Sequence, residues 1–367
     1  MKDIFVTQPS LPPLDEYVNC LEEIWDSKVL TNYGKYHNNF EKALSEYLGV
    51  KHCTLFANGT LALIVGLQAL RITGEVITTP YSFVATTHAL NWNGITPVFC
   101  DIDEKTCNLD PEKIEALITP HTTAIMPVHV YGHPCEIDKI SSIADTYGLK
   151  VIYDAAPAFG VEQNNNSILN FGDFSVLSFH ATKTLTTFEG GALITNDEKL
   201  KDRLYYLQNF GFADEETVVG PGINAKMNEL QAACGLLQLK HIDKEIKKRR
   251  LIALQYREKL INISGISFFE EDINTKYNYS YFPVRINKKE FGKSRDEVYA
   301  SLKKNNIYAR KYFYPLISEF ETYKGVPSVS EDNLKVAKKV SKEILCLPIY
   351  GGLMKEDIEK IFKVIGV

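Results

Sequence analysis

The sequence predicts an α/β fold, with a mainly parallel sheet in a large domain and a smaller α+β domain after it. From about residue 50 to residue 195, short β-rich runs alternate with helix-length amphipathic segments. This alternation is typical of a parallel sheet whose ligand lies at the carboxyl ends of the strands. Beyond Lys199 the pattern turns helical, and the tail mixes strand-like and helix-like runs. We therefore expect a large domain over residues 1–249, which includes the N-terminal segment, and a small domain over residues 250–367.

The elements of the large domain follow one another as strand and helix pairs. The expected pairs are 52–57 with 61–70, 75–80 with 82–91, 96–102 with 111–118 and 123–130 with 136–147, followed by strands at 149–156, 173–179 and 191–195. The three asparagines at 164–166 indicate a turn. A long helix over 227–260 then leads into the tail, where we expect strands at 280–286 and 344–350 and helices at 295–305 and 356–365.

The bulk composition is that of a globular protein without a membrane span. Of the 367 residues, 45% are hydrophobic and 24% are charged, and the mean hydropathy is -0.15. No apolar run approaches the ~18 residues that a membrane helix needs. The N-terminus, MKDIFVTQPSLPPLDEY, lacks a basic region followed by an apolar one. We therefore expect no secretion signal, no membrane partner and a cytoplasmic location.

Cysteine spacing and charge argue against two further classes of partner. The seven cysteines are scattered without a C-x-x-C pair, which favours neither a disulfide framework nor a thiolate metal site, so we expect no metal. The net charge is -5, and the most basic run, Lys244–Arg250, fits a solvated helix face with apolar spacers at Ile242, Ile246 and Leu251. Nucleic acid is therefore not an expected partner.

A candidate phosphate site follows the first strand. This strand runs into Asn58-Gly59-Thr60, after which a helix begins, and the free N–H groups and dipole of a helix N-terminus favour an anion. Taken alone, Thr60 is more simply an ordinary helix cap. The sequence contains neither G-x-G-x-x-G nor G-x-x-x-x-G-K-[ST], so the usual loops for a dinucleotide or a nucleoside triphosphate are missing.

Chemically distinctive side chains follow three other strands. Phe83 comes just after the strand at 75–80, Asp154 ends a strand that looks buried, and Ser178 ends a third strand five residues before Lys183. Lys183 stands alone among Ser, Thr, His and small residues, with Glu189 the only acid near it. Phe83 taken alone is more often a core residue, and Asp154 could instead form an internal ion pair or cap.

One chemistry uses these groups together, and it is that of pyridoxal 5'-phosphate. The cofactor needs a lysine that forms a Schiff base and moves protons, and a carboxylate that keeps its pyridine nitrogen protonated. Its phosphate suits a helix N-terminus, and its ring suits an aromatic platform. The four weak signals therefore indicate one cofactor.

The sequence resembles the DegT/DnrJ/EryC1/StrS family of PLP-dependent nucleotide-sugar aminotransferases, which have the fold-type I, aspartate-aminotransferase-like architecture. The resemblance covers nearly the whole chain, from LTNYGKYHNNFEKALSEYLGVKH through ANGTLAL, TTPYSFVATTHA, PVHVYGHP, YDAAPAFG, SFHATK and GINAKMNELQAACGLLQL to LCLPIYGGL. It implies that Lys183 forms the Schiff base and is the catalytic residue. It further implies that Asp154 binds the pyridinium nitrogen and that Phe83 stacks on the ring.

The same resemblance implies how the phosphate is held and how many chains build the site. Gly59, Thr60 and Ser178 are expected to bind the phosphate. Asn224, in GINAKMNE, matches a family asparagine that reaches the phosphate in the neighbouring subunit, so we expect a homodimer with shared active sites. The sequence departs from the family pattern at Pro157, where many relatives have His or Gln beside the ring, and at Lys226, which replaces the usual Arg.

The resemblance also implies the reaction, which is transfer of an amino group from glutamate to a nucleotide-linked keto sugar. SFHATK and FEGG, which contain His180 and Glu189, resemble relatives that aminate C4 of the sugar, whereas C3 relatives have other lysine loops. His180 could contact the sugar, position Lys183, or be an ordinary packed loop histidine. The remaining candidate substrate contacts are Thr31, Asn32 and Tyr33, which resemble the dTDP-sugar branch, and Arg310, Tyr312 and Tyr314.

The expected substrates are therefore dTDP-4-keto-6-deoxyglucose and glutamate, and the expected product is dTDP-4-amino-4,6-dideoxyglucose for a polysaccharide or glycoside. A UDP- or GDP-linked keto sugar, or amination at C3, remains an alternative within this class. Lys183 argues against relatives that carry histidine at that position and dehydrate sugars. A non-catalytic sensor with the same fold is the alternative from another class, and an oxidoreductase is less favoured because its nucleotide loop is missing.

Overall fold

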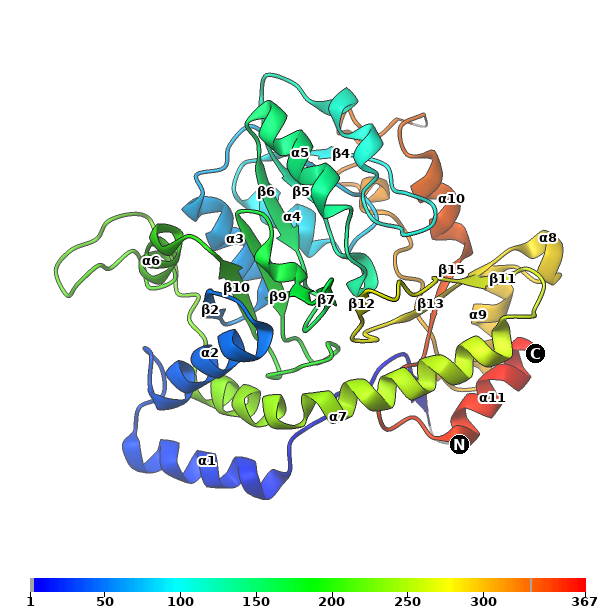
Figure 1. Cartoon of the computed structure of the whole chain (residues 1–367), viewed down its shortest axis with the longest axis horizontal. Coiled ribbons are helices and arrows are strands. Elements are labelled where there is room, and N and C mark those ends of the chain that lie inside the picture. Colours follow the sequence, from blue (N-terminus) through cyan, green and yellow to red (C-terminus); the bar gives the residue numbers. More distant parts are fainter. Residues whose placement is uncertain (1–2, 331) are drawn as a thin grey trace.

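Residues 3–330 and 332–367 are described by the computed structural model, and within them seven strands form a central sheet (Figure 1). In spatial order the strands are β2 (His52–Phe56), β10 (Gly191–Thr195), β9 (Phe174–Ser178), β6 (Lys150–Asp154), β5 (Thr122–Met126), β3 (Glu75–Thr78) and β4 (Thr96–Phe99). β10 is antiparallel to both of its neighbours, whereas the ladders from β9 to β4 are parallel. The predicted α/β fold with a mainly parallel sheet is confirmed.

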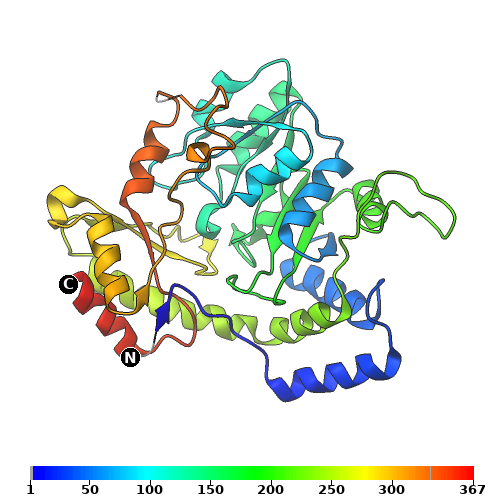
Figure 2. The same cartoon turned by 180° about the vertical axis from the view of Figure 1, so that it is seen from behind.

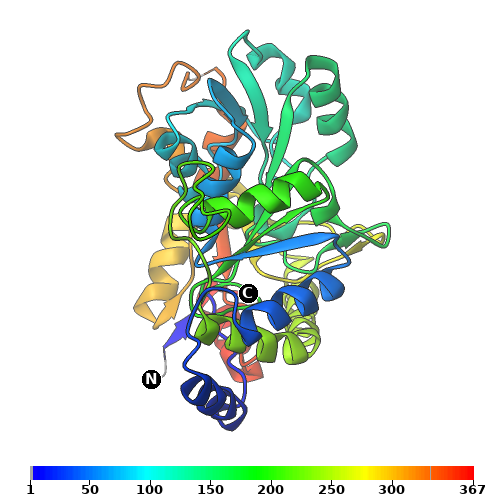
Figure 3. The same ribbon diagram turned by 90° about the vertical axis from the view of Figure 1, so that its left-hand side faces the viewer.

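Helices cover both faces of this sheet, because alternate side chains of each strand point to opposite sides. The helices of this region are α1 (Leu14–Ser27), α2 (Lys35–Leu48), α3 (Gly59–Ala69), α4 (Ala85–Trp92), α5 (Ile137–Tyr147), α6 (Glu198–Leu207) and α7 (Glu229–Leu260). On one face, α3, α4 and α6 pack with strand side chains such as Ile152. On the other, α2, α5 and the first half of α7 pack with side chains such as Tyr153. Figure 3 shows the sheet between these two layers.

A second core is built around the three-stranded antiparallel sheet of β11 (Ile266–Phe268), β13 (Phe282–Ile286) and β15 (Ile344–Leu347). It packs against α9 (Arg295–Lys304), α11 (Lys355–Ile365) and the second half of α7. At the other end of the chain, β1 (Ile4–Phe5) joins this region by pairing in parallel with β14 (Ile307–Tyr308), as Figure 2 shows. Because α7 runs through residue 250, the division into 1–249 and 250–367 stays a prediction.

The basic run in α7 is not a uniformly solvated face. Arg249 is fully buried, and its Nε donates to Glu245 Oε1 at 2.9 Å, while one of its terminal nitrogens donates to the Ile349 carbonyl at 3.3 Å. Leu251, predicted as an apolar spacer, is instead 60% exposed. The other basic side chains of the run are exposed, as predicted. In the described ranges, neither α7 nor any other helix combines the length and the apolar character that a membrane crossing requires.

Most predicted elements lie where the sequence places them, and the differences have local causes. The expected helix over 111–118 is two 3₁₀ turns, Pro111–Lys113 and Glu115–Leu117, instead of one α-helix. The helix predicted from residue 82 begins at Ala85, because the preceding residues form the turn after β3. The predicted asparagine turn is confirmed, with Asn164 and Asn165 at positive φ between β7 (Glu162–Gln163) and β8 (Asn166–Ser167).

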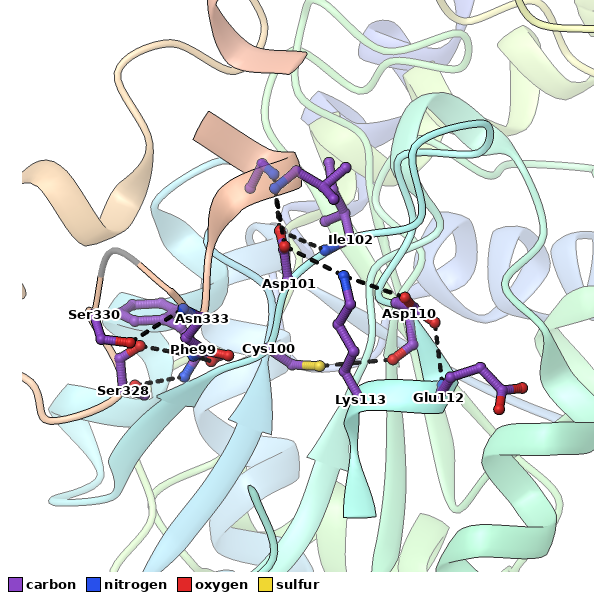
Figure 4. A network of polar contacts seen from close by, with 12 residues as sticks. Phe99, Cys100, Asp101, Ile102, Asp110, Glu112, Lys113, Ser328, Ser330 and Asn333 are labelled. Atoms are coloured by element: carbon purple, nitrogen blue, oxygen red, sulfur yellow. Dashed lines mark hydrogen bonds and ion pairs between the residues drawn. The ribbon is translucent and has the colours of Figure 1, made fainter. Parts of the chain in front are cut away.

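A buried carboxylate joins the end of β4 to α10 (Lys335–Glu343) in the last part of the chain (Figure 4). Asp101 accepts the N–H groups of Val336 and Ala337 at 2.9 and 2.8 Å, and it pairs with Lys113 at 3.3 Å. Since α10 has no capping side chain of its own, Asp101 performs that function from another element. The segment that leads to β15 is thereby fixed to the large sheet.

Candidate active site

The amino end of α3 lies against the carboxyl end of β9. Asn58 caps the helix, because its Oδ1 accepts the N–H of Leu61 at 2.9 Å, so the alternative that Thr60 is the cap is wrong. Gly59 allows a close approach, since a Cβ at this position would lie only 3.1 Å from the Cβ of Ser178. The first N–H groups of α3 and the hydroxyls of Thr60 and Ser178 therefore belong to one corner of a cavity.

Asp154, at the carboxyl end of β6, is the buried acid of this cavity. Its Oδ2 accepts the hydroxyl of Thr86 at 2.6 Å, and its Oδ1 accepts the N–H of Ala156 at 3.1 Å. The hydroxyl proton of Thr86 is thus donated to Asp154, so Thr86 accepts from the Ser82 hydroxyl at 2.8 Å. In the described part of the chain Asp154 forms no ion pair, and both of its oxygens keep acceptor capacity toward the cavity.

Lys183 lies in the loop after β9, where its backbone N–H donates to the His180 carbonyl at 2.8 Å. Its side chain is half-buried in a cavity wall, and its ammonium nitrogen lies 5.9 Å from the centre of the Tyr281 ring. Burial lowers the pKa of the Lys183 amine, while the charge of Asp154 and the phenol of Tyr312 oppose this shift. The neutral, nucleophilic form of the amine is thus more accessible than on a surface lysine.

These groups surround one cavity of about 560 Å³. Its walls come from the carboxyl ends of the large-sheet strands and from a later part of the chain. The predicted site residues that line it are Gly59, Thr60, Phe83, Asp154, Ser178, His180, Lys183, Glu189, Arg310 and Tyr312. The structure therefore brings the predicted cofactor and substrate groups together around Lys183, although their individual roles stay predictions.

The Phe83 side chain is 62% exposed and faces this cavity, so the alternative that it is a core residue is wrong. Its ring is a free apolar platform at the end of β3. Pro157 also lines the cavity, and its carbonyl accepts Asn278 Nδ2 and the Ser280 hydroxyl, each at 2.8 Å. Because proline lacks an N–H group and a polar side chain, it offers no donor to a ring bound here.

His180 and Glu189 lie at the cavity wall with partly exposed side chains, at 46% and 58%. The Nε2 atom of His180 is 3.6 Å from Glu189 Oε1, and its Nδ1 accepts the N–H of Thr182 at 3.2 Å. The bond from Thr182 assigns the ring proton to Nε2, which faces the carboxylate. The alternative of a packed loop histidine is therefore wrong, and His180 presents a polar edge to the cavity.

Five predicted residues lie outside this cavity in the single chain. Asn32 and Tyr33 line a separate surface hollow of about 810 Å³ beside α2, and Tyr33 stacks on Tyr205 at 4.3 Å between ring centres. Thr31, next to them, is exposed. Tyr314 packs against Arg295, whose guanidinium lies 4.8 Å from the centre of its ring.

Asn224 is the fifth of these residues. Its Oδ1 accepts the amine of Lys226 at 3.1 Å, and the same amine donates to Asn209 Oδ1 at 2.6 Å. The positively charged amine of Lys226 therefore holds the side-chain oxygens of Asn209 and Asn224 close to each other. The role of Asn224 in a neighbouring subunit stays a prediction.

The site also contains residues that the sequence did not reveal. Tyr131 and Tyr281 complete the cavity wall, and Thr86 holds Asp154 from outside it. Tyr131 lies in the quoted segment PVHVYGHP and Thr86 in TTPYSFVATTHA, but nothing in the sequence distinguishes them from core residues. Tyr281 directly precedes β13 and is far from Lys183 in the sequence. Only the folded structure brings the two side chains together.

The arrangement fits pyridoxal phosphate. A helix N-terminus with two hydroxyls suits the phosphate, and the close approach at Gly59 leaves the backbone amides uncovered by a side chain. The exposed ring of Phe83 suits a flat heterocycle, Asp154 suits a protonated ring nitrogen, and Lys183 suits an aldehyde carbon. No other group of the described cavity wall offers a competing nucleophilic amine.

Known proteins resemble this chain along its whole length. The profile of the DegT/DnrJ/EryC1/StrS aminotransferase family matches residues 14–366. A dTDP-4-amino-4,6-dideoxy-D-glucose transaminase of Escherichia coli is 55% identical over 365 residues, which are 99% of this chain and 98% of the relative. The protein of the same name from Shigella dysenteriae is 51% identical, again with 99% and 98% coverage.

A similar architecture is found in solved structures. A crystal structure of DesI in the presence of its TDP-sugar product has a TM-score of 0.95 to this chain at 35% sequence identity. The match covers 100% of this chain and 92% of that one. The cavity around Lys183 therefore lies in a fold that aminotransferases share, which agrees with the chemistry of its side chains.

Proposed function

Because the chain belongs to the DegT/DnrJ/EryC1/StrS aminotransferase family, we propose that it transfers an amino group from glutamate to dTDP-4-keto-6-deoxy-D-glucose. The products are dTDP-4-amino-4,6-dideoxy-D-glucose and 2-oxoglutarate. The full-length similarity to a dTDP-4-amino-4,6-dideoxy-D-glucose transaminase, at 55% identity, is the observation that carries this choice of substrate. The cavity that joins Lys183 to Asp154 and the N-terminus of α3 supports the reaction type.

The cofactor in this proposal is pyridoxal 5'-phosphate. Gly59, Thr60 and Ser178 bind its phosphate, Asp154 accepts a hydrogen bond from its ring nitrogen, and Phe83 packs on its ring. When bound, it supplies an electron sink for the carbon that loses or gains a proton. The hydroxyl of Thr86 fixes the direction in which the Asp154 carboxylate points, since it occupies the Oδ2 atom at 2.6 Å.

Lys183 is the proton carrier of the proposed reaction. Burial lowers the pKa of its amine, so this amine can accept a proton from the donor carbon and return one to the sugar carbon. Asp154 limits the shift by favouring the charged form. Opposed effects of this kind keep the amine able to exist in both states during a catalytic cycle.

The cavity wall offers polar groups for a charged substrate. Arg310 is exposed at the wall and forms no ion pair within the described ranges, so its guanidinium is available to a carboxylate or a diphosphate. His180 and Glu189 lie together at the wall and are placed to contact sugar hydroxyls. We attribute the choice of C4 to this pair, because it limits how the hexose can lie against the cofactor carbon.

The active unit in this proposal is a homodimer with shared sites. Asn224 and the segment with Thr31, Asn32 and Tyr33 lie outside the cavity of their own chain. The loop between α6 and α7, which extends away from the molecule in Figure 1, exposes the apolar side chains Phe210, Phe212, Val218, Val219 and Ile223. A partner subunit that covers these side chains would bring their loop, which includes Asn224, to a second cavity. The cytoplasmic location stays a prediction.

The reaction is tested by mixing the protein with pyridoxal phosphate, glutamate and dTDP-4-keto-6-deoxyglucose and measuring 2-oxoglutarate. Formation of 2-oxoglutarate that depends on the sugar is expected for the wild type. Lys183→Ala should remain folded but lose turnover by several orders of magnitude, because the proton carrier is missing. If Lys183→Ala turns over at the wild-type rate, the assignment of Lys183 is wrong; if the wild type is inactive although it binds the cofactor, the sensor alternative is favoured.

A further inference from the structure

Two buried tyrosines, of which Tyr131 also lines the cavity, meet one backbone carbonyl at the cavity wall. The hydroxyls of Tyr81 and Tyr131 lie 2.6 Å apart. Both also point to the Tyr312 carbonyl oxygen, Tyr81 at 3.1 Å and Tyr131 in a shorter contact. The Tyr312 carbonyl can only accept, so at least one phenol donates to it, and the two phenol protons are shared among the three contacts of this triangle.

The two tyrosines come from the large sheet, whereas Tyr312 comes from the last part of the chain. Tyr81 follows β3 and Tyr131 follows β5, and these strands are neighbours in the sheet. Tyr312 lies just after β14, in a segment whose side chains Arg310, Tyr312 and Phe313 line the cavity of Lys183. Hydrogen bonds of this triangle therefore link the turns after β3 and β5 directly to the cavity-wall segment that contains Tyr312.

This wall segment has two backbone anchor points, and the Lys311 side chain within it also pairs with Asp296 of α9. At its start, Arg310 exchanges backbone hydrogen bonds with Cys346 of β15, at 3.2 and 2.7 Å. Two residues later, the backbone carbonyl of Tyr312 contacts the hydroxyls of Tyr81 and Tyr131. Aromatic contacts add to the second point, since the ring centres of Tyr131 and Phe313 lie 6.0 Å apart with an angle of 7° between planes. The second point relates the segment to the sheet that carries Lys183, and a few residues later the Ile317 N–H donates to the Pro80 carbonyl at 3.0 Å.

We propose that Tyr81 and Tyr131 are positioning residues that set where Arg310 and Tyr312 stand relative to Lys183, and hence how tightly the nucleotide sugar is bound. The inference rests on the proposed function, because it assigns Arg310 and Tyr312 to the nucleotide sugar. Neither hydroxyl needs to touch the substrate. If the wall moves by about 1 Å, the substrate is misplaced relative to the reacting groups, and the rate can fall by as much as ~10²-fold. Loss of the two tyrosine hydroxyls should therefore have a measurable effect.

Two further observations support the link. Burial raises the pKa of both phenols well above the ordinary value, so both are neutral donors at neutral pH. Tyr131 has a φ of 59°, in the left-handed region that side chains other than glycine rarely adopt. Such a backbone persists only where surrounding contacts fix it, and the bond to Tyr312 is one of them.

The test compares Tyr81→Phe, Tyr131→Phe and the double variant as holoenzymes. Either single variant leaves one hydroxyl on the Tyr312 carbonyl, so we expect its KM for the nucleotide sugar to rise only about two- to threefold. The double variant leaves the carbonyl without a donor, and its KM should rise about tenfold or more. Calorimetric binding of thymidine 5'-diphosphate should weaken in parallel. Glutamate alone converts the cofactor in the first half-reaction, and this half-reaction should slow less than the half-reaction with the nucleotide sugar.

Tyr256→Phe is the matched control, because Tyr256 also donates from a buried phenol to a carbonyl, that of Pro348 at 2.7 Å, but does not line the cavity. It should lose stability without a change in KM. The inference is overturned if the double variant matches Tyr256→Phe in KM and nucleotide binding, or if both half-reactions slow equally. If the double variant does not fold, Tyr131→Phe decides by the same comparison. An inactive wild type would instead refute the proposed function.

Discussion

At Lys183, burial and charge act on the amine in opposite directions. Burial lowers the pKa of this amine, and Asp154 and Tyr312 partly restore it. The sequence already indicated this residue, because a lysine without neighbouring charges is unusual on a solvated surface. The residues that act on Lys183, directly or through Asp154, could be predicted less well. Asp154 was found at a strand end, whereas Thr86, which fixes its direction, looks in the sequence like any other helix residue.

Glu41 provides a residue-scale prediction outside the cavity. Burial raises the pKa of its carboxyl to about 7, against a weak hydrogen bond from the Leu55 N–H. An unfolded glutamate titrates near pH ~4.3, so between these values the folded chain binds more protons than the unfolded chain. The stability contributed by Glu41 is therefore complete below about pH 4.3 and falls as the pH rises through about 7.

We expect Glu41→Gln to remove this pH dependence, which amounts to about 3 kcal/mol between pH 4.5 and pH 8. Urea unfolding of both proteins at several pH values gives the difference in the free energy of unfolding. This difference should shift in favour of the Gln variant as the pH rises. A difference that stays constant with pH would show that Glu41 is ionised in the folded chain.

At the scale of elements, the strands of the large sheet were predictable because their β-rich runs end in turn residues. The predicted chemistry also lies at their carboxyl ends, with Gly59, Phe83 and Asp154 around one cavity. The segment 111–118 was misjudged because its apolar residues suit an α-helix, whereas the structure has two 3₁₀ turns there. Periodicity alone does not distinguish these two conformations over so few residues.

Asp101 gives the prediction at this scale, since it caps α10 from the end of β4 (Figure 4). Asp101→Ala should lower the free energy of unfolding by about 2 kcal/mol, because two helix N–H groups and the Lys113 amine lose a buried partner. Urea unfolding monitored by circular dichroism measures the loss.

The control for this experiment is Asp332→Ala, just before the same helix. Asp332 pairs with Lys335 at 2.8 Å, but its side chain is 91% exposed. Exposed pairs contribute roughly 0 to 1 kcal/mol, so this variant should remain close to the wild type. Equal effects of the two substitutions would mean that Asp101 does not anchor α10.

At the scale of the whole molecule, the cavity is built from segments far apart in the chain, and this part of the site could not be predicted. Tyr281 meets Tyr131 through the contact between the two cores. Their positions follow from tertiary packing, for which the sequence has no periodic signal. By contrast, Arg310 and Tyr312 were predicted from the cation and aromatic contacts that their side chains could supply, and they do line the cavity.

The proposed dimer leads to a complementation prediction. Lys183→Ala and Asn224→Ala should each be inactive or severely impaired as homodimers. When the two are mixed and subunits exchange, one site of each heterodimer has both Lys183 and Asn224, so about a quarter of the full activity should return in an equal mixture if exchange is random. Subunit exchange is followed separately with tagged chains. Exchange without recovered activity would place Asn224 in the site of its own chain.

Amination of C4 on a dTDP-linked keto sugar is tested by analysis of the product. The wild-type protein is incubated with glutamate and each of a panel of dTDP-, UDP- and GDP-linked 3-keto and 4-keto sugars, and the aminated carbon is assigned by NMR. We predict the highest kcat/KM for dTDP-4-keto-6-deoxyglucose, with nitrogen on C4 of the product. Nitrogen on C3, or a clear preference for a UDP- or GDP-linked sugar, would contradict the account.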